Sequence, residues 1–334
     1  MPDLPALPAG LTARPLTRDD VAAVAALLVA AEQLDDTGEF PDADDLAEWW
    51  DGWGVDLTAD GLAVTDDAGL VVGYATVFAS DSFRGAFEVT LEGRVRPDLR
   101  GRGVGRALLG WLLARGREVH AARHPDAPAL LTVVVPEAMT GLESLVRRAG
   151  LTERRWFRQM ERPLTDLPAP PPAVGFEIVP FSPDRDDEVR RAHNTAFLDH
   201  HGSSERDPEA WRSLFTGQRA FRPDLSVLAL ADGAVAGYAL AYIFEADARA
   251  TGKRQIHFGQ IGVLPSARGR GVASALIATA LRAGAADGCV TAGLDVDSDN
   301  VTGALHLYER LGFTTTRTQV SWSLDLPPSP ERRA

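Results

Sequence analysis

Two short stretches rich in glycine and arginine have the spacing needed to bind phosphate. They read RGRGVGR over 100–106 and RGRGVAS over 268–274. Each follows an apolar segment that predicts a strand, and each leads into an apolar pattern that predicts a helix, over 103–118 and 271–286. Free backbone N–H groups and the positive end of the helix dipole meet at such a turn, and glycine lets the backbone approach phosphate oxygens closely. The sequence therefore predicts two phosphate-binding loops.

The details of the loops exclude two common nucleotide sites. A P-loop requires a Gly-Lys-Ser/Thr run, and no lysine follows either loop. A dinucleotide fingerprint requires G-x-G-x-x-G with an acidic residue about 20 positions later. The pattern present is R-x-x-G-x-[G/A] after a strand that ends in V-x-P. It resembles the pyrophosphate-binding signature of the GNAT acyltransferase superfamily, through Arg100, Gly103 and Gly105 in one copy and the residues 268, 271 and 273 in the other.

The resemblance implies acyl-CoA, in particular acetyl-CoA, as cosubstrate, and transfer of the acyl group to a primary amine of a small molecule. The loop amides would hold the pyrophosphate, and the strand before the loop would pair with the pantetheine arm. A backbone N–H there, that of Ile261 by preference, would polarise the thioester carbonyl. The implied cofactor-binding residues of the second half are Ile261, Gly262, Val263, Arg268, Gly269, Arg270, Gly271, Val272, Ala273, Ser274 and Asn300. Those of the first half are Gly93, Arg94, Val95, Arg100, Gly101, Arg102, Gly103, Val104, Gly105 and Arg106.

The elements that must position these loops occur twice. Three segments of the first half recur in the same order in the second: 71–77 and 235–241, 95–108 and 263–276, 140–151 and 302–313. The proline-rich stretch 164–175 cannot continue a helix or a central strand. We therefore expect an α/β protein of two tandem GNAT-like domains, each a mixed, splayed β-sheet flanked by helices. Their expected bounds are 1–163 for an N-terminal, degenerate domain and 176–334 for a C-terminal, catalytic domain, joined by the linker 164–175.

The expected difference in catalysis depends on one aromatic residue. Transfer to an amine needs an acid for the departing thiolate, and in the GNAT superfamily this is often a tyrosine at the position of Tyr308. The first half has Val146 in that place, and Ala138 opposite Asn300. Neither replacement can exchange a proton or hydrogen-bond through its side chain. The first half is therefore expected to bind CoA without turnover or to have a structural role; a core aromatic remains the alternative for Tyr308.

The general base is harder to assign. Several superfamily members have a glutamate on the strand before the loop, and His257 stands at that position here. Strand alternation would put His257 on one face with Gly259, Ile261 and Val263. A histidine suits the role because its pKa is near neutral. A base acting through water, or a non-catalytic strand residue, remains open.

The acceptor pocket should lie near the opening helices and neighbouring strands. We expect His200, Tyr242 and Glu245 to contact the amine. The histidines around 193–201 have a spacing that invites a zinc interpretation, but no cysteine pair or H-E-x-x-H motif accompanies them, so no metal is expected. The two-domain plan also resembles that of mycothiol synthase, which implies a cysteinyl pseudodisaccharide as an alternative acceptor.

Composition limits the remaining classes of function. The chain of 334 residues has 47 acidic and 34 basic residues and a net charge of −13, which argues against nucleic-acid binding and against anionic membranes. No signal peptide or membrane span is predicted, so the cytoplasm is the expected location. A single cysteine excludes an intramolecular disulfide. A CoA-binding sensor or scaffold without catalysis is the alternative function, and either a monomer or a homodimer is compatible with the sequence.

Overall fold

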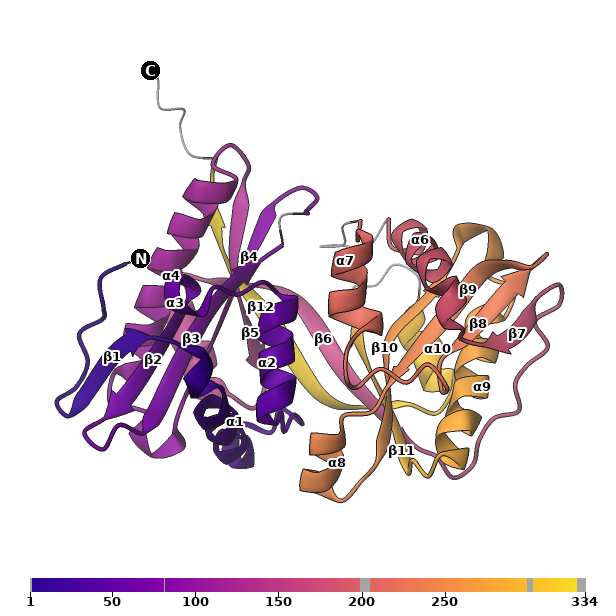
Figure 1. Ribbon diagram of the computed structural model, residues 1–334, viewed down its shortest axis with the longest axis horizontal. Coiled ribbons are helices and arrows are strands. Elements are labelled where there is room, and N and C mark those ends of the chain that lie inside the picture. The colour runs from indigo at the N-terminus through magenta and orange to yellow at the C-terminus, as the bar shows by residue number, and fades with distance from the viewer. Residues whose placement is uncertain (1, 81, 199–204, 299–302, 329–334) are drawn as a thin grey trace. The chain divides into compact units, whose positions relative to one another are not determined.

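A computed structural model describes residues 2–80, 82–198, 205–298 and 303–328 (Figure 1). The predicted site residues His200 and Asn300 lie outside the described residues. The strands are β1 (Leu11–Pro15), β2 (Gly61–Asp66), β3 (Val71–Ala79), β4 (Phe87–Val95), β5 (Ala129–Pro136), β6 (Thr152–Pro163), β7 (Glu177–Pro180), β8 (Val227–Ala231), β9 (Ala234–Tyr242), β10 (Gln255–Val263), β11 (Thr291–Asp297) and β12 (Thr314–Leu326).

Helices alternate with the strands. They are α1 (Val21–Asp35), α2 (Ala43–Gly52), α3 (Leu57–Asp60), α4 (Val104–Arg123), α5 (Thr140–Arg148), α6 (Asp186–Ala196), α7 (Pro208–Trp211), α8 (Glu245–Thr251), α9 (Val272–Ala286) and α10 (Ala304–Arg310). Short 3-10 turns lie at Arg18–Asp20, Pro97–Leu99, Pro183–Arg185 and Pro265–Ala267, and a π-helical turn at Arg212–Thr216.

The chain forms two compact units. Unit 1 contains Met1–Arg155 and Gln319–Ala334, and unit 2 contains Trp156–Thr318. The expected bounds 1–163 and 176–334 describe the two sequence copies, whereas the compact units divide the chain inside β6 and inside β12. The expectation of an α/β protein with mixed sheets is confirmed.

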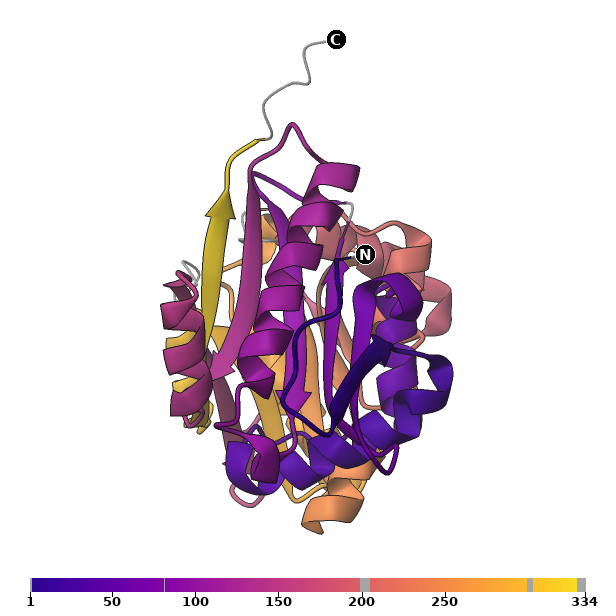
Figure 2. The same ribbon diagram turned by 90° about the vertical axis from the view of Figure 1, so that its left-hand side faces the viewer.

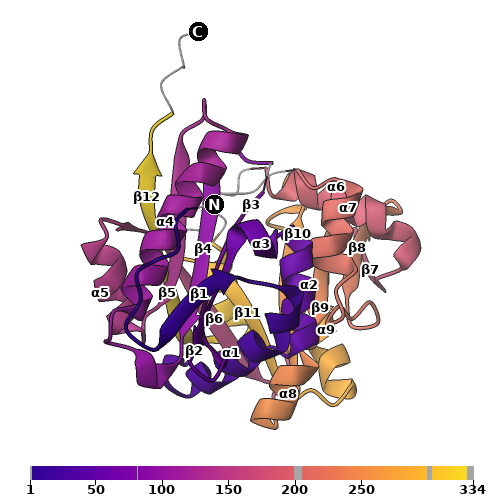
Figure 3. The same cartoon turned by 60° about the vertical axis from the view of Figure 1, so that its left-hand side comes forward.

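The sheet of unit 1 has the strand order β1-β2-β3-β4-β5-β12. Its one parallel pair, β4 with β5, runs from Phe87↔Ala129 to Thr90↔Thr132, and beyond it the two strands separate. Apolar residues of α4 and α5 pack on one face, and those of α1, α2 and α3 form a separate cluster on the other. Figures 2 and 3 show α4 and α5 together beside this sheet.

The sheet of unit 2 repeats this plan in the order β6-β11-β10-β9-β8-β7. Its parallel pair is β10 with β11, from Gln255↔Thr291 to Phe258↔Leu294. The apolar faces of α9 and α10 cover one side, while α6 and α7 pack on the other with Tyr238 and Tyr242 of β9. The linker belongs to this unit, because Leu164 is buried and Arg282 donates to the carbonyl of Leu167.

The last strand of each sequence copy lies in the sheet of the other unit. Residues 319–326 of β12 pair with β5, and residues 157–163 of β6 pair with β11. Figure 1 shows β12, in yellow, beside the magenta β5. Each unit therefore takes one antiparallel strand from the sequence of the other half.

Candidate active site

The separation of β10 and β11 opens a cleft in unit 2. After Phe258 and Leu294 the two strands stop pairing; β10 continues along β9, and β11 continues along β6. The cleft has a volume of about 580 Å³, and its walls come from β10, β11, the glycine loop, the start of α9 and α10. Nine of the residues expected to bind acyl-CoA line it: Ile261, Gly262, Val263, Arg268, Gly269, Gly271, Val272, Ala273 and Ser274.

A β-bulge marks the point of separation. The register between β10 and β9 shifts between Phe258 and Gln260, which leaves Gly259 as the additional residue. Gly259 is exposed, yet a Cβ atom there would lie 2.6 Å from the Tyr242 ring. Only glycine therefore allows Tyr242 to pack directly against the backbone of the bulge.

The bulge changes the face on which His257 lies. Phe258, Ile261 and Val263 all pack on the core beside α9, while the ring of His257 contacts Phe244 on the opposite side, 6.0 Å between centroids. The expectation that His257 shares a face with Ile261 and Val263 is wrong, because one added residue reverses the alternation.

The glycine loop and the start of α9 fit a phosphate group. Gly269 and Gly271 have φ values of +72° and +79°, in the left-handed region that glycine adopts readily. The first helical hydrogen bond runs from the amide of Ala275 to the carbonyl of Gly271, 3.0 Å, and no side chain caps the helix. The amides at 272–274 therefore have no partner within the helix, and these residues line the cleft.

The two arginines of this loop are engaged elsewhere. Arg268 donates to the carbonyl of Val263 at 3.2 Å and to that of Ala196, at the end of α6, at 2.8 Å. The guanidinium of Arg270 lies 4.4 Å from the centroid of the Phe176 ring, and Arg270 is not one of the cleft residues. Arg268 thus fixes the shape of the loop, and the binding of phosphate is left chiefly to the backbone.

A different arginine faces the cleft. Arg310, at the end of α10, is exposed and lines the cleft. It forms no ion pair within the described parts of the chain. Nothing in the sequence indicated that Arg310 would line the cleft, because it lies in a helix well past the glycine loop.

Tyr308 lies in the cleft wall as well as in the core. It comes from α10, is 8% exposed, and packs edge-on against Phe313 with 6.1 Å between ring centroids. Burial raises the pKa of Tyr308 to about 12. Its hydroxyl therefore keeps its proton at neutral pH and can donate it to a group in the cleft.

His257 meets an acidic residue that the sequence analysis did not select. Its Nε2 atom lies 3.5 Å from Oδ2 of Asp295, which lines the cleft. The cleft walls desolvate Asp295, which raises the pKa of its carboxyl above the usual range despite the opposing effect of His257. The available signal was the pair of acidic residues at 295 and 297, at alternate positions of an otherwise apolar strand.

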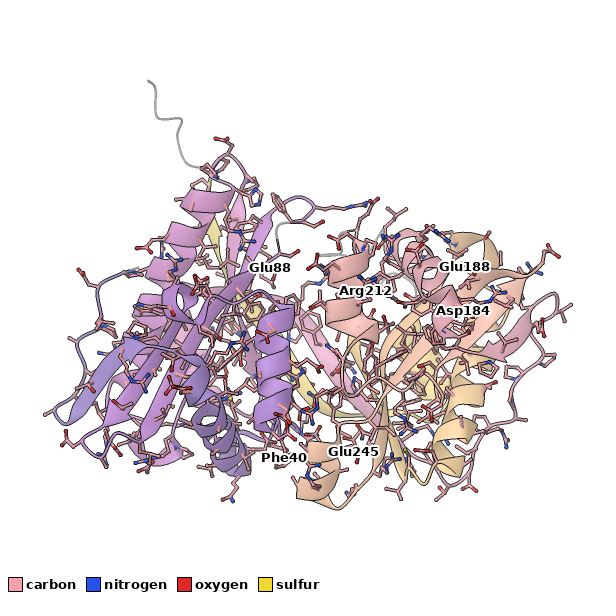
Figure 4. The ribbon with its side chains drawn as sticks, in the orientation of Figure 1. Phe40, Glu88, Asp184, Glu188, Arg212 and Glu245 are labelled. Atoms are coloured by element: carbon pink, nitrogen blue, oxygen red, sulfur yellow. The ribbon has the colours of Figure 1, made fainter. Side chains whose placement is uncertain are left out.

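Two predicted acceptor residues lie away from the cleft. Tyr242 is 3% exposed, in the core behind β10, and its hydroxyl has no hydrogen-bond partner among the described residues. Glu245 begins α8, where Figure 4 labels it. It forms an ion pair with Arg254 at 3.1 Å. The structure places neither side chain on the cleft wall.

Unit 1 has a similar loop with its arginine in an ion pair. Gly101 and Gly103 have φ values of +75° and +98°, and helical hydrogen bonding begins with Ala107 donating to Gly103 at 3.0 Å. Arg100 donates to both carboxylate oxygens of Asp35, at 2.5 and 2.9 Å. Asp35 is 1% exposed, so this ion pair is part of the core.

The region between the separating strands differs sharply in the two units. In unit 2 the residues that follow the last parallel pair, Gly259 and Asp295, line the cleft together with Tyr308. In unit 1 the β4 strand has no bulge, and the residues that follow its last parallel pair, Leu91 and Val133, are buried with Val146 in one apolar cluster. Only unit 2 has groups at this place that can exchange protons.

Neither a metal cluster nor a membrane helix is found in the described parts of the chain. No group of three or more His, Cys, Asp or Glu side chains there is arranged to hold a metal ion. No described helix combines the length and the apolar character needed to cross a membrane.

Comparison with known proteins identifies the family of the chain. Residues 25–127 and 187–313 match the model of the acetyltransferase (GNAT) family. The mycothiol acetyltransferase of Frankia casuarinae is 35% identical over 276 residues, 78% of this chain and 74% of its own length. That of Kineococcus radiotolerans is 33% identical over 331 residues, 95% and 97% of the two chains.

Solved structures share the fold along almost the whole chain. A GCN5-related N-acetyltransferase from Sphaerobacter thermophilus superposes with a TM-score of 0.76 at 25% identity, over 98% of this chain and 99% of its own. A tandem GNAT protein from the clavulanic acid biosynthesis pathway has a TM-score of 0.70 at 20% identity, covering 96% and 100%. The chain is therefore an acetyltransferase and belongs to the GNAT family.

Proposed function

We propose that the protein transfers an acetyl group from acetyl-CoA to a primary amine of a small molecule, and that this transfer takes place in the cleft of unit 2. The observation that carries the proposal is the difference between the two strand separations. Both units have a glycine loop at a helix N-terminus, but only unit 2 has Tyr308, Asp295 and the open position at Gly259 beside it. Under this proposal unit 1 either binds CoA without turnover or has a structural role.

Different residues in and beside the cleft have different roles in the reaction. The amides of 272–274 bind the diphosphate at the positive end of α9. Beyond the point of separation, 259–263 pairs only with β9 in the described sheet, so its other edge is available for main-chain hydrogen bonds with the pantetheine arm. Tyr308 holds the proton that the departing thiolate needs. His257 is not one of the residues that line the cleft, but its Nε2 atom lies 3.5 Å from Asp295, which is, and His257 is the group that accepts a proton from the acceptor.

We propose a mycothiol-type cysteinyl pseudodisaccharide as the acceptor. The support comes from the two relatives, both named mycothiol acetyltransferase, that cover three quarters or more of this chain. Glucosamine is the simpler acceptor against which this choice is tested.

Two matched substitutions test which unit binds the reacting acetyl-CoA. Ser274 and Arg106 occupy the third position of α9 and α4. A glutamate there favours the helix dipole, so folding is preserved, but its charge repels a diphosphate at the same helix end. We expect Ser274→Glu to raise the KM for acetyl-CoA at least 10-fold, about 1.4 kcal/mol, and Arg106→Glu to change it less than about 2-fold.

The assay follows labelled acetyl groups into the amide product. Release of CoA thiol is not a suitable signal, because a cysteinyl acceptor has a thiol of its own. If Arg106→Glu loses turnover and Ser274→Glu keeps it, the reaction takes place in unit 1 and the proposal is wrong. Transfer to glucosamine with no preference for the cysteinyl pseudodisaccharide would overturn the proposed acceptor and leave the acetyl transfer itself intact.

A further inference from the structure

Two titratable side chains meet at the point where β10 and β11 separate. The last parallel pair is Phe258↔Leu294, so Gly259 and Asp295 are the next residues along the two strands. Gly259 has no side chain to cover its neighbour, and the Asp295 side chain is 52% exposed while it lines the cleft. The bulge therefore opens the carboxylate of Asp295 toward the cleft.

His257 is the nearest ionisable partner of this carboxylate. Its Nε2 atom is 3.5 Å from Oδ2 of Asp295, and its side chain is 24% exposed. The edge of the Phe244 ring lies against the imidazole. The residue paired with His257 on β9 is Tyr242, which is also titratable. Burial raises the pKa of Tyr242, so its phenol stays protonated and uncharged. Asp295 is thus the one charged side chain seen in contact with His257 in the described residues.

The separation of 3.5 Å has a chemical consequence. It is longer than the usual 2.7–2.9 Å or so of a charge-assisted hydrogen bond, so the two groups are not locked together. An ammonium group has three N–H donors and can bond to both at once. When the imidazole is protonated, the same distance lets the carboxylate stabilise its charge.

We propose that Asp295 binds the ammonium group of the acceptor and, together with His257, removes its proton. This inference rests on the proposed function and deepens it, because it assigns the group that selects a cationic acceptor and the partner that supports the base. Asp295 acts as a ligand of the substrate and as the counter-ion of the imidazolium.

The protons balance as follows. His257 takes one proton from the ammonium and becomes an imidazolium ion paired with Asp295. The neutral nitrogen attacks the thioester carbonyl carbon, so a C–N bond forms and the C–S bond breaks. Tyr308 gives its proton to the leaving sulfur and recovers one from the nitrogen as the amide forms. The proton on His257 passes to solvent.

Unit 1 shows what the pair replaces. Val89, Leu91, Val133 and Val135 of unit 1 point into the core beside α4, so the residues that face the other way, as His257 and Asp295 do in unit 2, are Thr90 and Val134; neither side chain is ionisable. Both members of the pair are thus present in one unit and both are absent from the other, as expected if they act together.

The test compares Asp295→Asn, His257→Gln and the double variant in the full-length chain, with the cysteinyl pseudodisaccharide and glucosamine as acceptors. We expect Asp295→Asn to lower kcat/KM for the acceptor about 100-fold and to leave the KM for acetyl-CoA within 2-fold. The double variant should be no worse than the poorer single variant, because the pair acts as one unit.

Glu309→Gln is the matched control. It removes one negative charge from α10 next to Tyr308, but Glu309 bonds to His306 and is not a cleft residue. It should keep the activity of the parent protein with both acceptors. The asparagine variant is isosteric and half exposed, so its melting temperature should be unchanged.

Three outcomes would count against these ideas and can be told apart. A kcat/KM for the acceptor that is equal in Asp295→Asn and in the parent protein overturns the inference alone. Multiplicative losses in the double variant overturn the joint action of the pair, and so does a loss of activity in Asp295→Asn that is accompanied by a lower melting temperature. A parent protein that acetylates neither acceptor overturns the proposed function from which the inference starts.

Discussion

The bulge at Gly259 leads to a prediction about an exposed glycine. Replacing an exposed glycine by alanine usually changes stability little, or stabilises a protein by about 0.4–1 kcal/mol where the backbone is compatible. Gly259 is exposed and has no positive φ, so Gly259→Ala looks harmless from its surroundings in solvent. The structure predicts the opposite.

The size of the effect follows from the position of Tyr242. The new Cβ would lie 2.6 and 3.0 Å from two ring carbons of Tyr242, whereas carbon atoms in contact prefer about 3.5–4.0 Å. The ring cannot move away, because it is 3% exposed and lies between Phe221 and Phe244, with centroids at 5.6 and 6.4 Å. Overpacking of this kind costs about 1–3 kcal/mol, and we expect about 2 kcal/mol for Gly259→Ala.

Chemical denaturation measures the free energy of unfolding, and hydrogen exchange of the β10 peptide reports on unit 2 itself. In a Tyr242→Leu background the same glycine substitution should cost less than about 0.5 kcal/mol, because the clash is gone. Gly110→Ala is the control; this position inside α4 has nothing within 4 Å of a new Cβ, so alanine should stabilise by about 1 kcal/mol. A neutral or stabilising Gly259→Ala in the parent protein would refute the packing of Tyr242 against the bulge.

Three further outcomes can be measured. Arg310→Gln should raise the KM for acetyl-CoA about 3- to 10-fold, because Arg310 lines the cleft while Arg268 and Arg270 are engaged elsewhere. The effect should be smaller at high salt, which screens the charge. Arg148→Gln, at the equivalent place in unit 1, should leave the KM unchanged. The folded-state pKa of Tyr308, about 12, exceeds the value of about 10 expected in the unfolded chain, so its contribution to stability is complete below pH 10 and is lost as the pH rises toward 12. Tyr308→Phe should therefore reduce the alkaline decline of the unfolding free energy by up to about 1.4 kcal/mol per pH unit, and an unchanged slope would contradict the assigned burial. Fragments 1–163 and 164–334 should be inactive apart and active when co-expressed, because each sheet takes a strand from the other fragment; an active 164–334 alone would contradict this.

The sequence predicted those parts of the site that depend on local pattern. The loop at 268–274 could be located because glycine spacing, a preceding strand and a following helix lie together in the chain. Tyr308 could be found because the two copies align and the first has Val146 in its place. These features require no knowledge of which strands are neighbours.

Other parts depend on contacts between distant residues. Asp295 alternates with apolar residues along β11, so it looks like an ordinary solvent-facing position until the separation of β10 and β11 is known. The bulge at Gly259 adds a single residue to an otherwise regular strand, so alternation alone assigned His257 to the wrong face. The hydrogen bond from Arg268 to the carbonyl of Ala196 joins residues 72 positions apart, and no local sequence pattern predicts such a contact.

The exchange of strands also affects the order in which the protein can fold as it is synthesised. The sheet of unit 1 is completed by residues 319–326, and the hydrogen bond between Thr132 and Ser323 joins positions 191 residues apart. Until that segment leaves the ribosome, β5 has an unpaired edge, the kind of surface on which chains aggregate. Unit 2 is built from the continuous segment 156–318, so it has all its residues first. The amino-terminal unit, made first, is therefore the last to be finished.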